Sequence, residues 1–307
     1  MNTSLSTHYS INNSENIDSN IKGISSEKNS IFNFVYKIEQ ENISYNLEYI
    51  EDIYYNLLKE EKEIEIRPIY GYMAKQKDIN EQMRAILVDW LIDVHYNFNF
   101  NKETLFQTIW ILDTYLSYEI IQRNKLQLLG ITCLFISCKY NEICYPKTNE
   151  FIYVTDNAYD IKELLKMEKD VLKKLEFNIL VPTSIQFYDI LSKIFNFNSE
   201  QYNFGRYFLE SNLIDYNMIC FSSSIIAISS AYIVMKFFNI KDYEYLYLIN
   251  DKNNDYISKE NIKTVIKESA RNLCFLVKNI SQSSLKAVKN KFSLKEYDFV
   301  SQYCEDD

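Results

Sequence analysis

The feature that most constrains the fold is a helical hydrophobic period, which begins near residue 44 and recurs almost to the end of the chain. Within each block, apolar residues return every three or four positions, which is the spacing of one face of an α-helix. Only 4 Gly and 3 Pro occur among 307 residues, too few for the many turns of an all-β protein. No segment has a strong strand pattern, so the sequence predicts an all-α protein.

Pro182 divides the predicted helices into two groups of five, which suggests two similar lobes. A one-sided helix in the segment "LEYIEDIYYNLLKEEKE" precedes the first group, and a basic helix in "SLKAVKNKF" follows the second. The first group is expected near residues 80–97, 102–117, 124–140, 148–154 and 160–176, and the second near 183–195, 199–213, 221–237, 243–248 and 258–279. Asn101 and Asp160 are the expected N-caps of two of these helices.

The expected organisation has three parts. Residues 1–43 are rich in Asn and Ser and lack periodicity, so we expect a flexible tail. Residues 44–181 form the first lobe with its preceding helix, and residues 182–307 form the second lobe.

Composition excludes several classes of function. A net charge of −9 argues against a nucleic-acid binder, which would carry a basic stripe. The six cysteines form no Cys-x-x-Cys motif and only two histidines occur, so we expect no metal and no cofactor. The sequence also lacks a Gly-rich phosphate loop and a nucleophile-and-base motif.

The sequence does not favour a membrane protein either. The N-terminus has neither a basic n-region nor an apolar h-region, and the most apolar runs are too short or broken by serines. We expect a soluble intracellular protein, in the nucleus or the cytoplasm, with reduced cysteines.

Charged residues lie where the helical period calls for apolar ones. Arg84 shares the apolar face of its helix, and Asp113 does the same on the next helix. A buried charge needs a partner, so the two either pair between neighbouring helices or reach solvent by snorkelling. Lys139 and Glu168 lie on the stripes of two later helices, where they are either stripe edges or polar anchors for a partner.

The first helix of the first group also has a second apolar face, formed by Met83, Ile86, Leu87, Trp90 and Val94. One face of this helix serves the core of its lobe. The other face either packs elsewhere in the core or forms a groove for a ligand.

Several consecutive motifs resemble one known family. The segment "MRAILVDWL" resembles the signature of the cyclin box of mitotic, A- and B-type cyclins. The segments "NKETLFQTIWILDTYLS", "CKYNEICYP" and "LLKMEKDVLKKLEFNILVPTSIQF" follow in the order and spacing of that family, and the resemblance spans roughly residues 45–301. It is highly specific in the first lobe and looser in the second.

This resemblance implies two five-helix lobes with flanking N- and C-terminal helices. It also implies a non-catalytic regulatory subunit that binds and activates a cyclin-dependent kinase. Two alternatives remain: a transcription-factor-B-like or retinoblastoma-like protein with this fold, and a degenerate cyclin that binds a kinase without activating it.

The resemblance assigns roles to particular residues. Arg84 and Asp113 match a buried salt bridge of the family. The positions that match kinase contacts are Lys139, Glu168, Tyr140, Phe177, Tyr49 and Ile53. The positions that match the groove for Arg-x-Leu segments of substrates and inhibitors, or that border it, are Met83, Ile86, Leu87, Trp90, Asp93, Arg123, Leu126, Gln127 and Val154.

The sequence departs from the family at a few positions. Asp93 stands where the family usually has glutamate, which shortens its reach toward a ligand arginine by one methylene. Asn141 replaces a frequent acidic residue. The first arginine of the chain is Arg67, so no Arg-x-x-Leu destruction box precedes the folded region, and no Lys-Glu-Asn box precedes it either.

Overall fold

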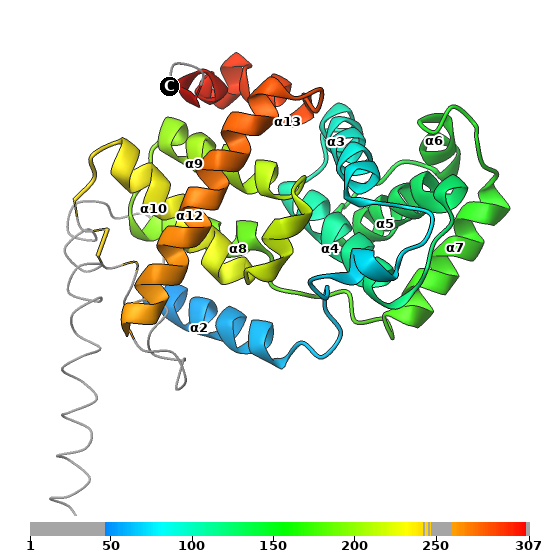
Figure 1. The fold of residues 1–307 in the computed structure, drawn as a ribbon, viewed down its shortest axis with the longest axis horizontal. Helices are drawn as coiled ribbons and strands as arrows, with labels where there is room; N and C mark the ends of the chain where they lie inside the picture. Colours follow the sequence, from blue (N-terminus) through cyan, green and yellow to red (C-terminus); the bar gives the residue numbers. More distant parts are fainter. Residues whose placement is uncertain (1–46, 242, 245, 247–258, 305–307) are drawn as a thin grey trace, which may run out of the picture. The chain divides into compact units, whose positions relative to one another are not determined.

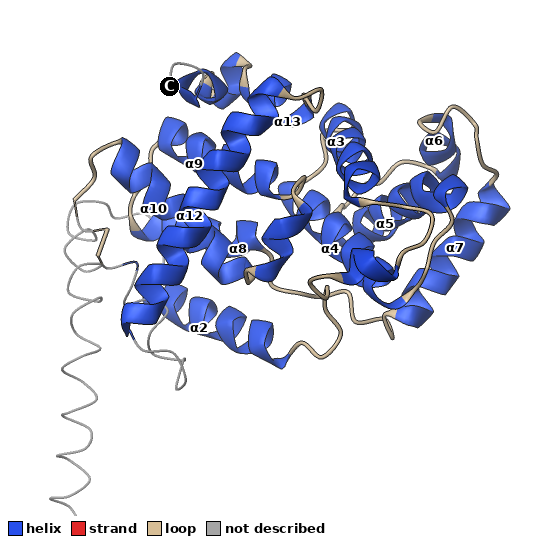
Figure 2. Cartoon of the chain, in the orientation of Figure 1, coloured by secondary structure: helices blue, strands red, loops and turns tan. Residues whose placement is uncertain are grey.

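The computed structural model describes residues 47–241, 243–244, 246 and 259–304. Within these residues the chain folds into helices and connecting loops, without a strand (Figure 2). The all-α fold expected from the sequence is therefore confirmed for the described residues. The expected flexible tail at residues 1–43 lies outside them.

The first lobe consists of five helices, and a further helix, α2 (Leu47–Glu63), precedes it (Figure 1). The five helices are α3 (Glu81–Asn97), α4 (Lys102–Tyr118), α5 (Leu126–Asn141), α6 (Thr148–Tyr153) and α7 (Ile161–Lys174). The side chain of Asn101 accepts a hydrogen bond from Glu103 N, and that of Asp160 accepts one from Glu163 N, so both expected N-caps are confirmed.

Helix α5 forms the centre of the first lobe, where all its residues from Leu128 to Cys138 are buried. A helix that is apolar all round needs neighbours on every side, which explains its lack of a polar face. The close approach of α3 depends on Gly130, because a Cβ at this position would lie 2.8 Å from Leu87 Cδ1. A side chain at residue 130 would have to displace the side chain of Leu87 or the helix that carries it.

The second lobe contains the described helices α8 (Ser184–Ile194), α9 (Ser199–Asn212), α10 (Ser223–Phe237) and α12 (Lys259–Gln282). The short helix expected at residues 243–248 falls largely outside the described residues. Helix α13 (Ala287–Phe292) follows and corresponds to the predicted basic helix. Gly205 lets α9 approach α8, because a Cβ there would overlap the hydroxyl of Tyr188.

Helix α2 precedes the first lobe in sequence but packs on the second lobe (Figure 1). Its buried Tyr54 makes an edge-to-face contact with Phe187 of α8, with ring centroids 5.5 Å apart. Near its end, Glu61 accepts hydrogen bonds from the backbone N and the Oγ of Ser224, at 3.0 and 2.6 Å. A carboxylate at the start of α10 also complements the dipole of that helix.

Candidate functional site

Arg84 and Asp113 form a bidentate ion pair between α3 and α4. Arg84 Nε lies 2.6 Å from Asp113 Oδ1, and Nη2 lies 2.6 Å from Oδ2. Tyr72 donates a further hydrogen bond to Oδ1 at 2.8 Å. Burial alone would lower the pKa of Arg84, but the Asp113 carboxylate outweighs it and the net pKa shift is upward. The structure thus brings together the two charges that the sequence placed on apolar stripes.

The same guanidinium also joins the two lobes. Arg84 Nη1 donates hydrogen bonds to the carbonyl oxygens of Leu213 and Ile214, at 3.0 and 3.1 Å. These carbonyls directly follow α9 of the second lobe. Helical periodicity could not have revealed this contact, because it links residues 129 and 130 positions apart.

Lys139 and Glu168 form a second ion pair, between the last turn of α5 and the middle of α7. This pair lies at the surface: the side chain of Lys139 is 32% exposed and that of Glu168 is 12% exposed. Lys139 Nζ also lies over the ring of Phe135, 4.3 Å from its centroid, and partial burial lowers the pKa of the amine. Each side chain is held by its partner while part of it remains accessible to another molecule.

Large exposed apolar side chains lie at or after the ends of α5 and α7, the two helices that carry this pair. Tyr140, which follows Lys139, is 50% exposed, and Phe177, after the end of α7, is 68% exposed. Ile143 and Leu180 extend the same kind of surface and are fully and 67% exposed, respectively. Apolar side chains of this size, left in water, are typical of a surface for a protein partner.

Two successive hydrogen bonds inside the first lobe hold the segment that carries Phe177. Asn141 Nδ2 donates to Gln107 Oε1 at 2.6 Å, and Gln107 Nε2 donates to the carbonyl of Ile179 at 2.7 Å. Phe177 has a φ of 61°, a left-handed conformation that neighbouring contacts must stabilise. Helical periodicity does not single out Gln107; its signal in the sequence is an amide within the apolar run "LFQTI" of α4.

Tyr49 and Ile53 lie on the exposed face of α2, at 58% and 49% exposure. Tyr54 and Leu58 on the opposite face of this helix are buried. The remaining expected contact residues, Lys139 among them, belong to the first lobe. The expected kinase contacts therefore lie on two parts of the molecule: helix α2, which packs on the second lobe, and the first lobe itself.

The expected docking groove centres on α3. Ile86 is 53% exposed, whereas Leu87 and Leu126 are each only 6% exposed and contribute mainly to the core. Met83, Trp90, Gln127 and Val154 are half-buried, and Asp93 and Arg123 are exposed. The structure therefore gives this face an apolar ridge at Ile86, with half-buried side chains around it.

Asp89, beside Trp90, has a role that the sequence did not indicate. Its Oδ1 accepts a hydrogen bond of 3.0 Å from the backbone N of Ala287, the first residue of α13. Burial raises the pKa of this carboxyl group. Asp89 thus ties the C-terminal helix to α3, so that the polar side of α3 also has a structural role.

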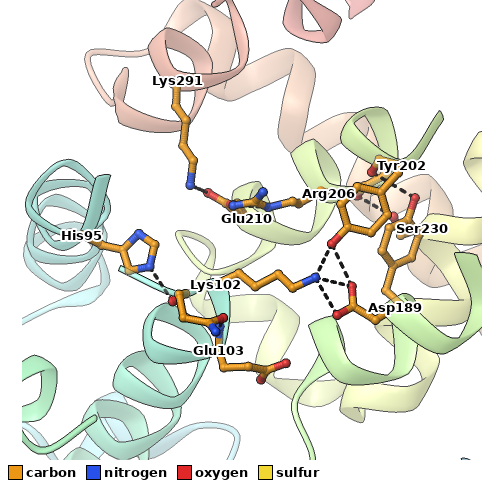
Figure 3. Close-up of polar contacts among 12 residues, drawn as sticks. His95, Lys102, Glu103, Asp189, Tyr202, Arg206, Glu210, Ser230 and Lys291 are labelled. Atoms are coloured by element: carbon orange, nitrogen blue, oxygen red, sulfur yellow. Dashed lines mark hydrogen bonds and ion pairs between the residues drawn. The ribbon is translucent and has the colours of Figure 1, made fainter. Parts of the chain in front are cut away.

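The second lobe contains a buried cluster of charges that the sequence did not indicate (Figure 3). Glu210 of α9 is fully buried and accepts from Lys291 Nζ at 2.7 Å and from Arg206 Nε at 2.9 Å. Burial would raise the pKa of Glu210, but Lys291 and Arg206 reverse this effect and lower it. Burial also lowers the pKa of the nearby His95 to about 4, so its ring is neutral at physiological pH.

Two kinds of feature are absent from the residues that the structure describes. None of the helices described is both long and apolar enough to span a bilayer. Within the same part of the chain, no group of three His, Cys, Asp or Glu side chains is arranged to hold a metal ion.

Together, these features define, for the described residues, an all-helical protein of two lobes, with a partly exposed ion pair and exposed aromatic side chains on the first lobe. Comparison with protein families gives two adjacent matches: the cyclin N-terminal domain over residues 52–180 and the cyclin C-terminal domain over residues 182–306. The chain belongs to the cyclin family, which confirms the resemblance found in its motifs.

The curated relatives include mitotic cyclins of the B type. G2/mitotic-specific cyclin-B of Hydra vulgaris is 35% identical over 258 residues, which cover 81% of this chain and 66% of that protein. Cyclin-B1-5 of Oryza sativa subsp. japonica is 38% identical over 210 residues, which cover 68% of this chain and 46% of that protein. The chain thus spans 66% and 46% of the length of these two relatives.

Solved structures with the same fold include a viral cyclin from herpesvirus saimiri. It matches with a TM-score of 0.60 at 19% identity, over 72% of this chain and 97% of that chain. A chain of the yeast RNA polymerase II CTD kinase complex CTDK-1 matches with a TM-score of 0.55 at 12% identity, over 70% of this chain and 71% of that chain. At such low identity these likenesses concern the fold alone.

Proposed function

We propose that this chain is the non-catalytic regulatory subunit of a Ser/Thr protein kinase complex, which binds and activates a cyclin-dependent kinase. The observation that carries the proposal is the partly exposed Lys139–Glu168 pair, together with the exposed rings of Tyr140, at the end of α5, and Phe177, just after α7. The mitotic names of its relatives support a role in cell-cycle progression. We propose the nucleus or the cytoplasm as its location.

The activation has a simple physical basis. Protein kinases need an ion pair between a lysine and a glutamate, and an ordered activation segment, before phosphoryl transfer becomes fast. A protein that binds only the arrangement in which these parts are in place shifts the population of the kinase toward it. In this mechanism the regulatory subunit supplies binding free energy and no reacting group.

The residues divide this work between polar and apolar contacts. Lys139 and Glu168 hold each other in place, so little side-chain entropy remains to be lost when they bond to the backbone of the kinase. Tyr140 and Phe177 supply apolar area that becomes buried in the complex. Aromatic anchors of this kind usually dominate the energetics of an interface. Tyr49 and Ile53 add a second area of contact on α2.

We also propose that Ile86, Met83 and Trp90 of α3, together with the residues around them, bind Arg-x-Leu segments of substrates and inhibitors. Their partial exposure on the surface of the first lobe supports this proposal. Asp93 supplies the negative charge that an arginine requires. A docked substrate has a raised effective concentration at the kinase, without any change in the kinase itself.

The deciding experiment is affinity purification of the chain from its own cells, followed by identification of the bound kinase and a histone phosphorylation assay. We expect a cyclin-dependent kinase to copurify and to be active. A bound but inactive kinase would instead indicate a degenerate cyclin. Absence of a kinase, together with salt-dependent binding of DNA, would favour the transcription-factor-B-like alternative.

A further inference from the structure

The proposed kinase contacts lie on two parts of the molecule that are anchored separately. Tyr49 and Ile53 lie on α2, which is fixed to the second lobe through the buried Tyr54. Lys139 and Glu168 lie on α5 and α7 of the first lobe. A partner contacts both parts at once only if the two lobes keep a fixed orientation, and this requirement rests on the proposed function.

A polar clamp joins the two lobes (Figure 3). Lys102, the first residue of α4, places its Nζ 2.6 Å from Asp189 Oδ2, 2.7 Å from Asp189 Oδ1 and 2.5 Å from Tyr202 Oη. Tyr202 in turn donates a hydrogen bond to Asp189 Oδ1 at 2.8 Å. The ammonium group therefore donates two hydrogen bonds and forms an ion pair, in contacts to α8 and α9.

The clamp has the geometry of a specific contact. The side chains of Lys102 and Asp189 are 28% and 26% exposed, so water screens this pair less than it screens a fully exposed one. Nζ approaches Tyr202 from the hydroxyl end of its ring, whose centroid lies 5.1 Å away. Three contacts to one ammonium hold the first turn of α4 at a defined place on the second lobe.

On the second lobe, the clamp and the contact with α2 involve the same helix, α8. Asp189 lies two residues after Phe187 on α8, and Phe187 is the residue against which Tyr54 of α2 packs. A shift of α8 relative to α4 would therefore move α2, and with it Tyr49 and Ile53, relative to the first lobe.

On the first lobe, the clamp is connected to α5, the helix that carries Lys139. The backbone N of Asn101, next to Lys102, donates to Glu142 Oε1 at 2.7 Å, and the hydroxyl of Thr104 bonds to the same oxygen. Glu142 caps the end of α5, three residues after Lys139. The start of α4 is thus fixed to the end of the helix that carries Lys139 and Tyr140.

We propose that Lys102 is a positioning residue, which sets the relative placement of α2 and of the Lys139–Glu168 surface through its clamp to Asp189 and Tyr202. Arg84 also crosses between the lobes, but it ends on the carbonyls of Leu213 and Ile214 after α9. The clamp instead ends on α8, the helix that supports α2. Lys102 therefore controls the fit of the surface to its partner without touching the partner.

The first arm of the test measures the lobes without a kinase. Spin labels are placed on the exposed Cys144 of the first lobe and Cys274 of the second, with Cys220 and Cys304 changed to serine. Cys133 and Cys138 are buried, and burial raises the pKa of both thiols, so they do not compete for the label. We expect Lys102→Met to broaden or shift the distance distribution between the labels.

The matched control is Lys125→Met. Lys125 forms an ion pair of similar exposure with Glu163, at 2.5 Å, but this pair lies within the first lobe. We expect the control to leave the distance distribution unchanged. The exchanged pair Lys102→Asp with Asp189→Lys is expected to restore the distribution of the parent, because it preserves the attraction between α4 and α8.

The second arm measures binding to a purified cyclin-dependent kinase. Lys102→Met is expected to weaken binding on the order of tenfold. When the two lobes are no longer held in one orientation, the effective concentration of the second contact area at the bound kinase falls. In this variant, the further change Tyr49→Ala with Ile53→Ala should cost less affinity than it costs in the parent. The exchanged pair should recover most of the affinity.

Particular outcomes would overturn the inference. An unchanged label distance in Lys102→Met would show that the clamp does not set the lobe orientation, whatever happens to kinase binding. A changed distance with parental kinase affinity would show that the orientation does not matter for the partner. Failure of the parent protein itself to bind a kinase would refute the proposed function, and the label distances would still report on the clamp.

Discussion

Asp113 occupies the centre of the contact between α3 and α4, with each of its carboxylate oxygens 2.6 Å from a nitrogen of Arg84. The arginine side chain is only 1% exposed and extends to two carbonyls of the second lobe. Because neither charge reaches water, each depends on the other for its stability inside the protein.

The first prediction concerns this pair. Arg84→Ala should lower the free energy of unfolding by about 3–5 kcal/mol, because it leaves the Asp113 carboxylate buried without its partner. Urea denaturation of the purified variant measures the change. Lys125→Ala removes one member of a half-exposed pair and should have little effect. A parental midpoint for Arg84→Ala would show that the buried pair contributes no stability.

The second prediction concerns pH. Burial, reinforced by the nearby Asp189, raises the pKa of Glu103 to about 7, although Thr183 donates a hydrogen bond to this carboxyl group. A raised carboxyl pKa means that the folded state binds the proton more tightly than the unfolded state. Protonated Glu103 therefore stabilises the folded state. This stabilisation is complete below the unfolded pKa near 4.5 and is lost as the pH rises through the folded pKa of about 7.

Glu103→Gln should therefore flatten the loss of stability between pH 5 and 7. We expect the parent to lose about 1–3 kcal/mol more than this variant over that range. Urea midpoints at closely spaced pH values measure the difference, and the exposed Glu65→Gln serves as control. Parallel pH profiles for Glu103→Gln and the parent would contradict the assignment.

The third prediction concerns the hydrogen bonds of Gln107, which join Asn141 to the segment that carries Phe177. Gln107→Leu should cost about 1–3 kcal/mol, because the Ile179 carbonyl loses its partner and the Asn141 amide keeps only its bond to the Ser137 carbonyl. It should also weaken kinase binding, since the segment that carries Phe177 loses an anchor. Thermal melts and binding titrations check both effects. Adding Asn141→Leu should recover part of the stability, and a further loss would exclude this explanation.

Much of the fold could be predicted from the sequence, because local patterns encode it. The N-caps Asn101 and Asp160 mark helix starts through contacts within three residues, and an apolar period identifies each helix. The partnership of Arg84 and Asp113 could be proposed because both charges interrupt apolar stripes of consecutive helices. In each case the signal lies within one helix or in its neighbour along the chain.

The contacts between residues far apart in the sequence carried no such signal. Lys102 stands at the start of a helix, where a lysine is usually solvated, and its partner Asp189 lies 87 residues away. Glu210 is fully buried, but its charge is balanced partly by Lys291, 81 residues further along the chain. Periodicity identifies the buried face of a helix and not the element that covers it, so these contacts required the three-dimensional structure.

The last prediction is that the two proposed surfaces can be separated by mutation. Lys139→Ala with Glu168→Ala should abolish both kinase binding and activation. Residues at the centre of an interface typically cost on the order of 2 kcal/mol or more each when truncated. Both side chains are partly exposed, so the double variant should melt close to the parent.

The groove variant should behave differently. Met83→Ala with Ile86→Ala leaves the buried Leu87 in place, so the core between α3 and Gly130 is preserved. Such a variant should activate the kinase toward a short peptide as well as the parent does. It should slow only the phosphorylation of substrates with an Arg-x-Leu segment, because it removes tethering and leaves the kinase switch intact. If a folded groove variant lost short-peptide phosphorylation as completely as the Lys139/Glu168 variant, the exposed apolar face of α3 would belong to the kinase interface and would not be a separate docking site.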